Sequence, residues 1–161
     1  MAIVLTRIDN RLIHGQVLEA WVPFTRADCI VVASDQVADM PMHCRLMAAS
    51  VPKNIKLLIG SVTEVSAALQ SEELAALRIL LLYENSQDAL QAHRTGILFD
   101  NLNLGNMHAG EGKVRFSCTL ALDPADIENL RSLEDEGVAI GCQCIPADKE
   151  RPWHKLIRES R

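Results

Sequence analysis

The chain has 161 residues and a mass of 17.8 kDa, enough for one domain with a substantial hydrophobic core. Its net charge of −5 and pI near 5.5 argue against a nucleic-acid-binding surface. It contains no apolar run of the roughly 18 residues that a membrane helix needs, no signal-peptide pattern and no disulfide-framework spacing among its five cysteines, so we expect a cytoplasmic protein.

The first half of the chain alternates predicted strands and helices. Short apolar runs predict strands at 2–8, 28–34 and 56–60. Helical spacing and helix start signals predict helices at 15–26, 36–50 and from 61 to about 70. In the first of these helices Val17, Trp21 and Phe24 share one face, which we expect to be the core face. Ser61 and Glu64 form a capping-box pattern at the start of the third.

The second half repeats this alternation. Strands are predicted at 76–83, 101–106 and 138–146. Helices are predicted at 86–96, from Asp123-Pro124 to Gly137, and over 153–160. The turn-rich stretch 107–116 is expected to form a loop or a small hairpin. No linker or repeat interrupts the pattern, so residues 1–161 are predicted to form a single α/β domain. Its sheet should be open, doubly wound and mainly parallel, with helices on both faces.

The stretch RIDNRLIHGQV, at residues 7–17, leaves the carboxyl end of the first predicted strand, where open parallel sheets bind ligands. His14 stands before a predicted helix, whose positive end favours an anion and a neutral, nucleophilic ring. Arg7 and Arg11 place two cations nearby, and the planar fork of Arg11 suits a phosphoryl group. The alternative is that His14 and Gly15 merely form a turn before the helix.

The same stretch resembles the active-site loop of the IIB components of the phosphoenolpyruvate-dependent sugar phosphotransferase system, mannose/fructose/sorbose family. The resemblance extends over essentially the whole chain, through IVVASD at 30–35, LNLGNMH at 102–108, EGK at 111–113 and LEDEGVAIGCQCIP at 133–146. It implies an open, mainly parallel α/β fold, in agreement with the pattern of elements.

The resemblance also implies a function. His14 would accept a phosphoryl group from a phosphohistidine of the IIA partner and pass it to a sugar held by the membrane components IIC and IID. Arg11 would bind the phosphoryl group, and Asp9 would brace the loop. Further phosphoryl-binding or loop-supporting residues are expected at Arg7, Asn10, Gly15 and Gln16. The protein would then be a protein-histidine phosphotransferase that reaches the membrane through IIC and IID.

Other motifs add little to this hypothesis. The chain has no phosphate-binding P-loop, no dinucleotide fingerprint and no zinc-ligand spacing, so we expect no cofactor and no metal. Ser34 and Asp35 follow the second predicted strand and His108 follows the fifth, so all three are candidates for the same pocket. Ser34 and Asp35 fit equally well as caps of the next helix.

Three functions remain open at this point. The first is a IIB transferase that serves sugar uptake. The second is a regulatory phosphocarrier without a sugar acceptor. The third is a non-catalytic anion-binding module in which His14 is only a ligand contact.

Overall fold

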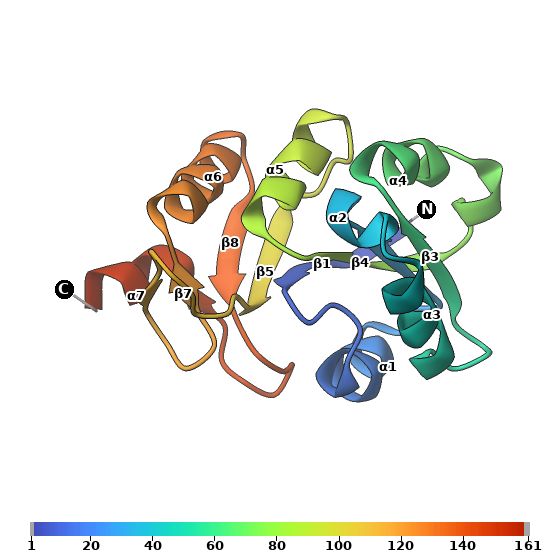
Figure 1. Ribbon diagram of the computed structural model, residues 1–161, viewed down its shortest axis with the longest axis horizontal. Coiled ribbons are helices and arrows are strands. Elements are labelled where there is room, and N and C mark those ends of the chain that lie inside the picture. Colours follow the sequence, from blue (N-terminus) through green and yellow to red (C-terminus); the bar gives the residue numbers. More distant parts are fainter. Residues whose placement is uncertain (1, 160–161) are drawn as a thin grey trace.

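The computed structural model describes residues 2–159, without the side chain of Glu159. Its main sheet has seven strands in the order β3-β2-β4-β1-β5-β8-β9 (Figure 1). All neighbouring strands pair in parallel except β8 and β9, which are antiparallel. The strands are β1 (Ala2–Asp9), β2 (Cys29–Ala33), β3 (Lys56–Gly60), β4 (Arg78–Tyr83), β5 (Asn101–Asn106), β8 (Ala139–Cys142) and β9 (Arg151–Pro152). The predicted open and mainly parallel sheet is confirmed.

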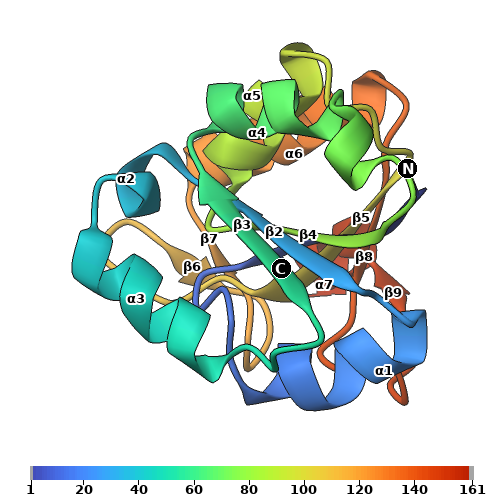
Figure 2. The same ribbon diagram turned by 90° about the vertical axis from the view of Figure 1, so that its right-hand side faces the viewer.

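Helices cover both faces of this sheet, so the doubly wound arrangement is confirmed as well (Figure 2). One face carries α4 (Val62–Leu69), α5 (Ser86–Arg94) and α6 (Pro124–Asp135). The other face carries the π-helical turn η1 (Val17–Trp21) with α1 (Val22–Thr25), α2 (Asp35–Ala38) and α3 (Pro41–Ser50). The 3₁₀ turn η2 (Glu72–Leu74) precedes β4, and α7 (Trp153–Glu159) follows β9. Strands β6 (Val114–Arg115) and β7 (Ala121–Leu122) form a small antiparallel hairpin. Within residues 2–159, no helix has the length and hydropathy that a membrane crossing requires.

Burial on both faces explains why the central strands are continuous apolar runs rather than alternating ones. In β4, Ile79, Leu81 and Tyr83 face the core under α4–α6, whereas Leu80 and Leu82 face the core under α1–α3. All five residues of β2 are buried. Such two-sided burial is the pattern expected of a parallel sheet between two helical layers.

Most predicted helix starts are confirmed. Ser61 accepts from the backbone N–H of Glu64, and the Glu64 carboxylate accepts from the backbone N–H of Ser61. Asp123 caps α6 in the same reciprocal way, with Pro124 at the first helical position. These caps satisfy backbone N–H groups that have no partner inside the helix.

Two predicted elements and one predicted core residue differ from the structure. The helix predicted at 36–50 is broken into α2 and α3, because Pro41 starts a new helix. The strand predicted at 138–146 ends at Cys142, where a strap of residues 143–150 leaves the sheet. Phe24 is 67% exposed, so the prediction that it shares the core face of Trp21 is wrong. The last residue of the helix predicted at 153–160 lies outside the described residues.

Candidate functional site

The loop that follows β1 is fixed by backbone hydrogen bonds to its neighbours. The Asn10 N–H donates to the Asn106 carbonyl at the end of β5, at 2.9 Å. The amide of Asn106 also donates to the side chain of Asn10. Leu12 donates to the Asp9 carbonyl at 2.9 Å and adopts a φ of 56°, a left-handed conformation that closes the turn. The loop therefore presents His14 from a defined backbone.

Asp9 is the centre of the site, and its side chain has no exposed surface. Its Oδ2 atom lies 2.8 Å from Nε2 of His14 and accepts from Nη2 of Arg7 at 3.1 Å. Its Oδ1 atom accepts from the backbone N–H of Arg11 at 3.0 Å. The Arg11 Nε atom is 3.4 Å from the same oxygen. One carboxylate thus binds two arginines and the histidine.

The surroundings of Asp9 determine its charge. Burial alone would raise the pKa of the Asp9 carboxyl, but the hydrogen bond to His14 and the charge of Arg7 outweigh burial and lower that pKa. Asp9 is therefore ionised at neutral pH and can only accept hydrogen bonds. The proton of a neutral His14 ring then resides on Nε2, which leaves the lone pair on Nδ1.

Arg7 lies inside the protein rather than on its surface. Its guanidinium is fully buried and donates to Asp9, to the side chain of Asn103, and to the carbonyls of Gln143 at 2.8 Å and Cys144 at 3.1 Å. Burial lowers the pKa of Arg7, and the charge of Asp9 partly opposes that effect. Of the two roles considered for Arg7, loop support fits this buried position and phosphoryl binding does not.

Two neighbours, Trp21 and Gly105, allow the Arg7 guanidinium to lie inside the protein. The Arg7 guanidinium carbon lies 5.2 Å from the ring centre of Trp21, within the range of a cation–π contact. A Cβ atom at Gly105 would lie 2.0 Å from that same carbon. Gly105 therefore permits an approach that any side chain would block.

Arg11 is the cation that remains accessible beside His14. Its side chain is 42% exposed, and its Nη2 atom donates to Oε1 of Gln16 at 3.0 Å. The His14 carbonyl accepts from the Leu18 N–H at 3.0 Å, so the helical segment 15–25 begins directly after His14. A Cβ atom at Gly15 would meet no atom within 4 Å, and the φ of Gly15 is not positive, so turn geometry does not require a glycine there.

The remaining candidates do not enter this hydrogen-bond network. Ser34 caps α2 by accepting from the Val37 N–H, and it donates to Glu84 at 3.0 Å. Asp35 accepts from the Val62 N–H at the start of α4. Ser34 thus caps the next helix, α2, as in the alternative considered above, whereas Asp35 binds the start of α4 instead. His108 is exposed, in the loop after β5. Among the described residues, no cluster of His, Cys, Asp or Glu side chains has the arrangement of a metal site.

Comparison with known proteins assigns the family. Residues 3–161 match the family of the PTS system sorbose subfamily IIB component. The chain is 34% identical to N-acetylgalactosamine-specific phosphotransferase enzyme IIB component 2 of Escherichia coli, over 96% of this chain and 98% of that protein. It is 30% identical to the fructose-specific EIIB component of Bacillus subtilis, over 98% and 97%.

Solved structures agree with this assignment. The IIBSor domain of the sorbose permease from Klebsiella pneumoniae superposes with a TM-score of 0.94, at 29% identity, over 100% of this chain and 99% of that chain.

The mannose-specific EIIAB component of Escherichia coli is 29% identical over 98% of this chain but only 49% of its own length. The chain therefore belongs to the IIB components of the sugar phosphotransferase system, sorbose subfamily.

Proposed function

We propose that this protein carries a phosphoryl group on His14, accepting it from a IIA phosphohistidine and passing it to a sugar imported through IIC and IID. The observation that carries the proposal is the 2.8 Å contact between His14 Nε2 and a buried, ionised Asp9. It orients one ring nitrogen inward and leaves Nδ1 as the nucleophile on a side chain that is 15% exposed. The proposed site of action is the cytoplasm, next to the membrane components.

In the first transfer, the lone pair of His14 Nδ1 attacks the phosphorus of the donor phosphohistidine. The donor P–N bond breaks, and its electron pair returns to the donor ring. The Nε2 proton stays on His14, where Asp9 stabilises the positive charge that the ring acquires. In the second transfer, a sugar hydroxyl oxygen attacks the phosphorus, the P–Nδ1 bond breaks, and the hydroxyl proton leaves to a base outside this chain.

Arg11 is the residue best placed to bind the phosphoryl oxygens. Its exposed guanidinium is joined to Gln16, and rotation away from Gln16 would free two parallel N–H donors for an anion. The start of the helical segment directly after His14 adds favourable partial charge. Positioning and charge stabilisation of this kind are the main protein contributions to phosphoryl transfer.

The relatives support the partners named here and leave the sugar unassigned. The relative called a mannose-specific EIIAB component carries both parts in its name, which favours IIA as the donor of this chain. The other relatives are named for fructose, N-acetylgalactosamine and sorbose. A regulatory carrier without a sugar acceptor would use the same residues for the first transfer.

The proposal is tested with purified general phosphotransferase components, IIA and phosphoenolpyruvate. The wild type should gain one acid-labile, base-stable phosphoryl group, and His14→Ala should gain none while keeping its circular dichroism spectrum. His108→Ala is the matched control, because it removes an exposed histidine outside the Asp9 network, and it should be labelled normally. A label that persists in His14→Ala, or that has the stability of a cysteinyl phosphate, would disprove the assignment.

A further inference from the structure

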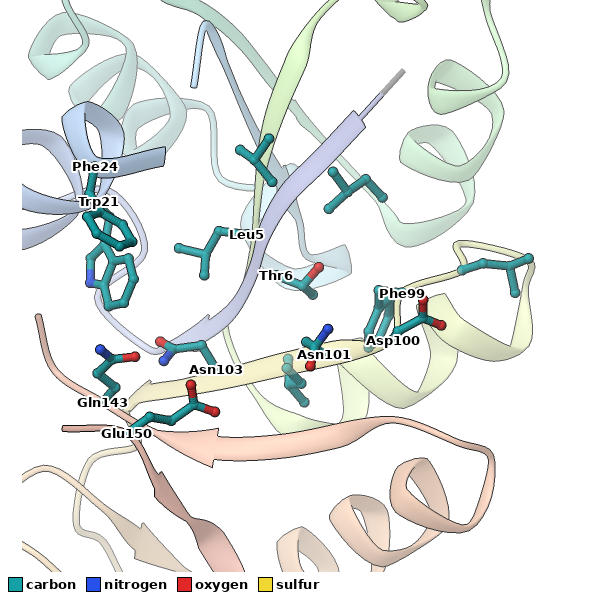
Figure 3. Close-up of a pocket in the computed structure, with 14 residues that line it drawn as sticks. Leu5, Thr6, Trp21, Phe24, Phe99, Asp100, Asn101, Asn103, Gln143 and Glu150 are labelled. Atoms are coloured by element: carbon teal, nitrogen blue, oxygen red, sulfur yellow. The ribbon is translucent and has the colours of Figure 1, made fainter. Parts of the chain in front are cut away.

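Within the described residues, part of the main sheet has no helix over it. On the α1–α3 side, the buried apolar cluster draws its strand residues from β1 to β4 and none from β5 or β8. There β5 presents Asn101 and Asn103, and a groove of about 500 Å³ lies over them beside α1 (Figure 3). Neither His14 nor Arg11 lines this groove, but three of its lining residues, Trp21, Asn103 and Gln143, also contact Arg7, so the groove adjoins the proposed phosphorylation site without including its reactive residues.

The groove has an apolar side and a polar, acidic side. Trp21 and Phe24 stand on one side, and Gln143 and Glu150 on the other (Figure 3). Asp100 and Glu150 are the only ionisable residues among those that line it, and both are exposed acids. The lining therefore favours a cation and disfavours a phosphorylated or carboxylate ligand.

Glu150 reaches its position because Gly141 has no side chain. A Cβ atom at Gly141 would lie 2.0 Å from Oε1 of Glu150. The carboxylate thus rests directly on β8 at the wall of the groove. A substitution at Gly141 would move this charge without removing it.

An apolar depression adjoins the groove. It has a volume of about 400 Å³ and is lined by Ala20, Phe24, Ile145, Pro146 and Ala147. Phe24 lines both hollows and is 67% exposed. Its ring packs edge-to-face on Trp21 at 6.1 Å and 88°, which orients it although it faces solvent. Oriented, exposed aromatic side chains are typical anchors of protein interfaces.

The strap of residues 143–150 forms the boundary of both hollows and is fixed by its own hydrogen bonds. The Gln143 amide donates to the Asp148 carbonyl at 2.9 Å, and the Ile145 N–H donates to the Asp148 carboxylate at 3.2 Å. The Cys144 carbonyl accepts from the Trp21 indole at 2.9 Å. This surface is therefore preformed, which lowers the entropic cost of binding.

We propose that the groove and the adjoining depression form one docking face for a partner protein segment that carries an apolar side chain flanked by lysine or arginine. The apolar side chain would pack on Phe24 in the depression, and a basic side chain would enter the groove near Glu150, which lies beside Gln143 at the same end of the groove as Trp21 and Phe24, whereas Asp100 lies at the other end (Figure 3). A second copy of this chain fits poorly, because its net charge is −5 and a two-fold contact would place acidic grooves together. The proposal does not depend on phosphoryl transfer at His14.

The test is a titration of the ¹⁵N-labelled protein with three capped pentapeptides, followed by NMR. The first peptide has leucine between two lysines, the second replaces both lysines by glutamate, and the third replaces leucine by glycine. The first should shift the side-chain amide signals of Asn101, Asn103 and Gln143 and the indole N–H of Trp21. The second should shift none of them, and the third should bind at least about fivefold more weakly. His14→Ala should bind like the wild type.

Variants identify the two halves of the face. Glu150→Gln, Gly141→Ala and Phe24→Ser should each weaken binding of the first peptide by about fivefold or more. Glu128→Gln removes an exposed acid on α6, on the other face of the sheet, and should have no effect. Unchanged affinity in Glu150→Gln and Phe24→Ser, equal binding of the acidic peptide, or no shifts at millimolar peptide would overturn the proposal.

Two further outcomes would reassign the occupant. Equally tight binding of 1,5-diaminopentane, which has no peptide backbone, would show a site for small free amines instead of a docking face. Concentration-dependent dimers in sedimentation velocity that Phe24→Ser abolishes would show that a second copy occupies it. Either result contradicts the proposed partner segment.

Discussion

The Nε2 atom of His14 lies 2.8 Å from Oδ2 of Asp9, and this carboxylate has no exposed surface. The same oxygen accepts from the buried Arg7, and the hydrogen bond to His14 together with the charge of Arg7 outweighs burial and keeps the Asp9 carboxyl ionised. The partly exposed His14 ring therefore has one preferred tautomer. The buried Asp9 carboxylate holds the ring proton on Nε2, and this leaves Nδ1 as the reactive nitrogen.

Asp9→Asn tests this relationship. The amide can donate as well as accept, so the proton of His14 is no longer held on Nε2. The change also leaves Arg7 buried without its anion, which should cost about 3 kcal/mol of unfolding free energy. The ¹⁵N shifts of the His14 ring should indicate a mixture of tautomers, and phosphorylation should slow. An unchanged ring spectrum at full rate would contradict the assigned role of Asp9.

Arg11→Lys should slow phosphoryl transfer by at least about tenfold, or roughly 1.4 kcal/mol of barrier. A lysine ammonium keeps the charge but cannot present two parallel donors to the phosphoryl oxygens. Rapid-quench measurement of the single-turnover rate from phosphorylated IIA checks this. Arg115→Lys is a suitable control because Arg115 is an exposed arginine of β6 whose side chain donates to the Cys118 carbonyl, outside the Asp9 network. Equal rates for Arg11→Lys and the wild type would make Arg11 a bystander.

Gly105→Ala should destabilise the fold and disturb the site at a distance. The new Cβ would lie 2.0 Å from the guanidinium carbon of Arg7, so the arginine must leave Asp9 or the strands must separate. We expect the free energy of unfolding, measured with urea, to fall by about 3 kcal/mol, which is the usual cost of breaking a buried ion pair. Gly15→Ala is the matched control, because no atom lies within 4 Å of its Cβ position, and its stability should change by less than about 0.5 kcal/mol. Similar stabilities for the two variants would show that Arg7 is not confined.

Asp88 should make stability depend on pH. Burial, followed by the charges of Glu84 and Asp35, raises the pKa of the Asp88 carboxyl to about 6 from an ordinary value of 3.8. The folded state thus binds the Asp88 proton more tightly than the unfolded state does. The stabilisation that Asp88 contributes to the folded state is therefore complete below about pH 4 and is lost as the pH rises through about 6.

The corresponding measurement compares urea unfolding of the wild type and Asp88→Asn at several pH values. Between about pH 4 and pH 7, the free energy of unfolding of the wild type should fall by roughly 2–3 kcal/mol relative to that of the variant. Asparagine does not titrate, so the variant lacks this slope. A constant difference between the two proteins over that range would show that Asp88 has an ordinary pKa.

The sequence was most informative where local chemistry decides the structure. The bounds of β3 and β5 agree with the predicted strands, and the caps at Ser61 and Asp123 follow from side chains three residues from their partners. The two-residue break between α2 and α3 was missed although Pro41 marks it. Helical periodicity also placed Phe24 on the core face, where a π-helical turn shifts the register.

Sequence proximity misled the interpretation of Arg7. Arg7 lies only four residues before Arg11, but it belongs to β1, and its side chain is buried. Arg11 belongs to the loop that follows β1, and its side chain is exposed. The Arg7 partners Asn103 and Gln143 lie 96 and 136 residues away, and only the parallel pairing of β1, β5 and β8 brings them together. The alternation of Asn101, Asn103 and Gly105 in β5 was the available signal of a polar sheet face.

The most direct test of the account is the position of the phosphoryl group on the His14 ring. The protein, labelled with ¹⁵N in its histidines, is phosphorylated through IIA and examined by two-dimensional ¹H–¹⁵N NMR and by ³¹P NMR. Because Asp9 holds the Nε2 proton, the phosphorus should be coupled to Nδ1, with Nε2 still protonated. A phosphoryl group on Nε2, or on any residue other than His14, would contradict the central claim.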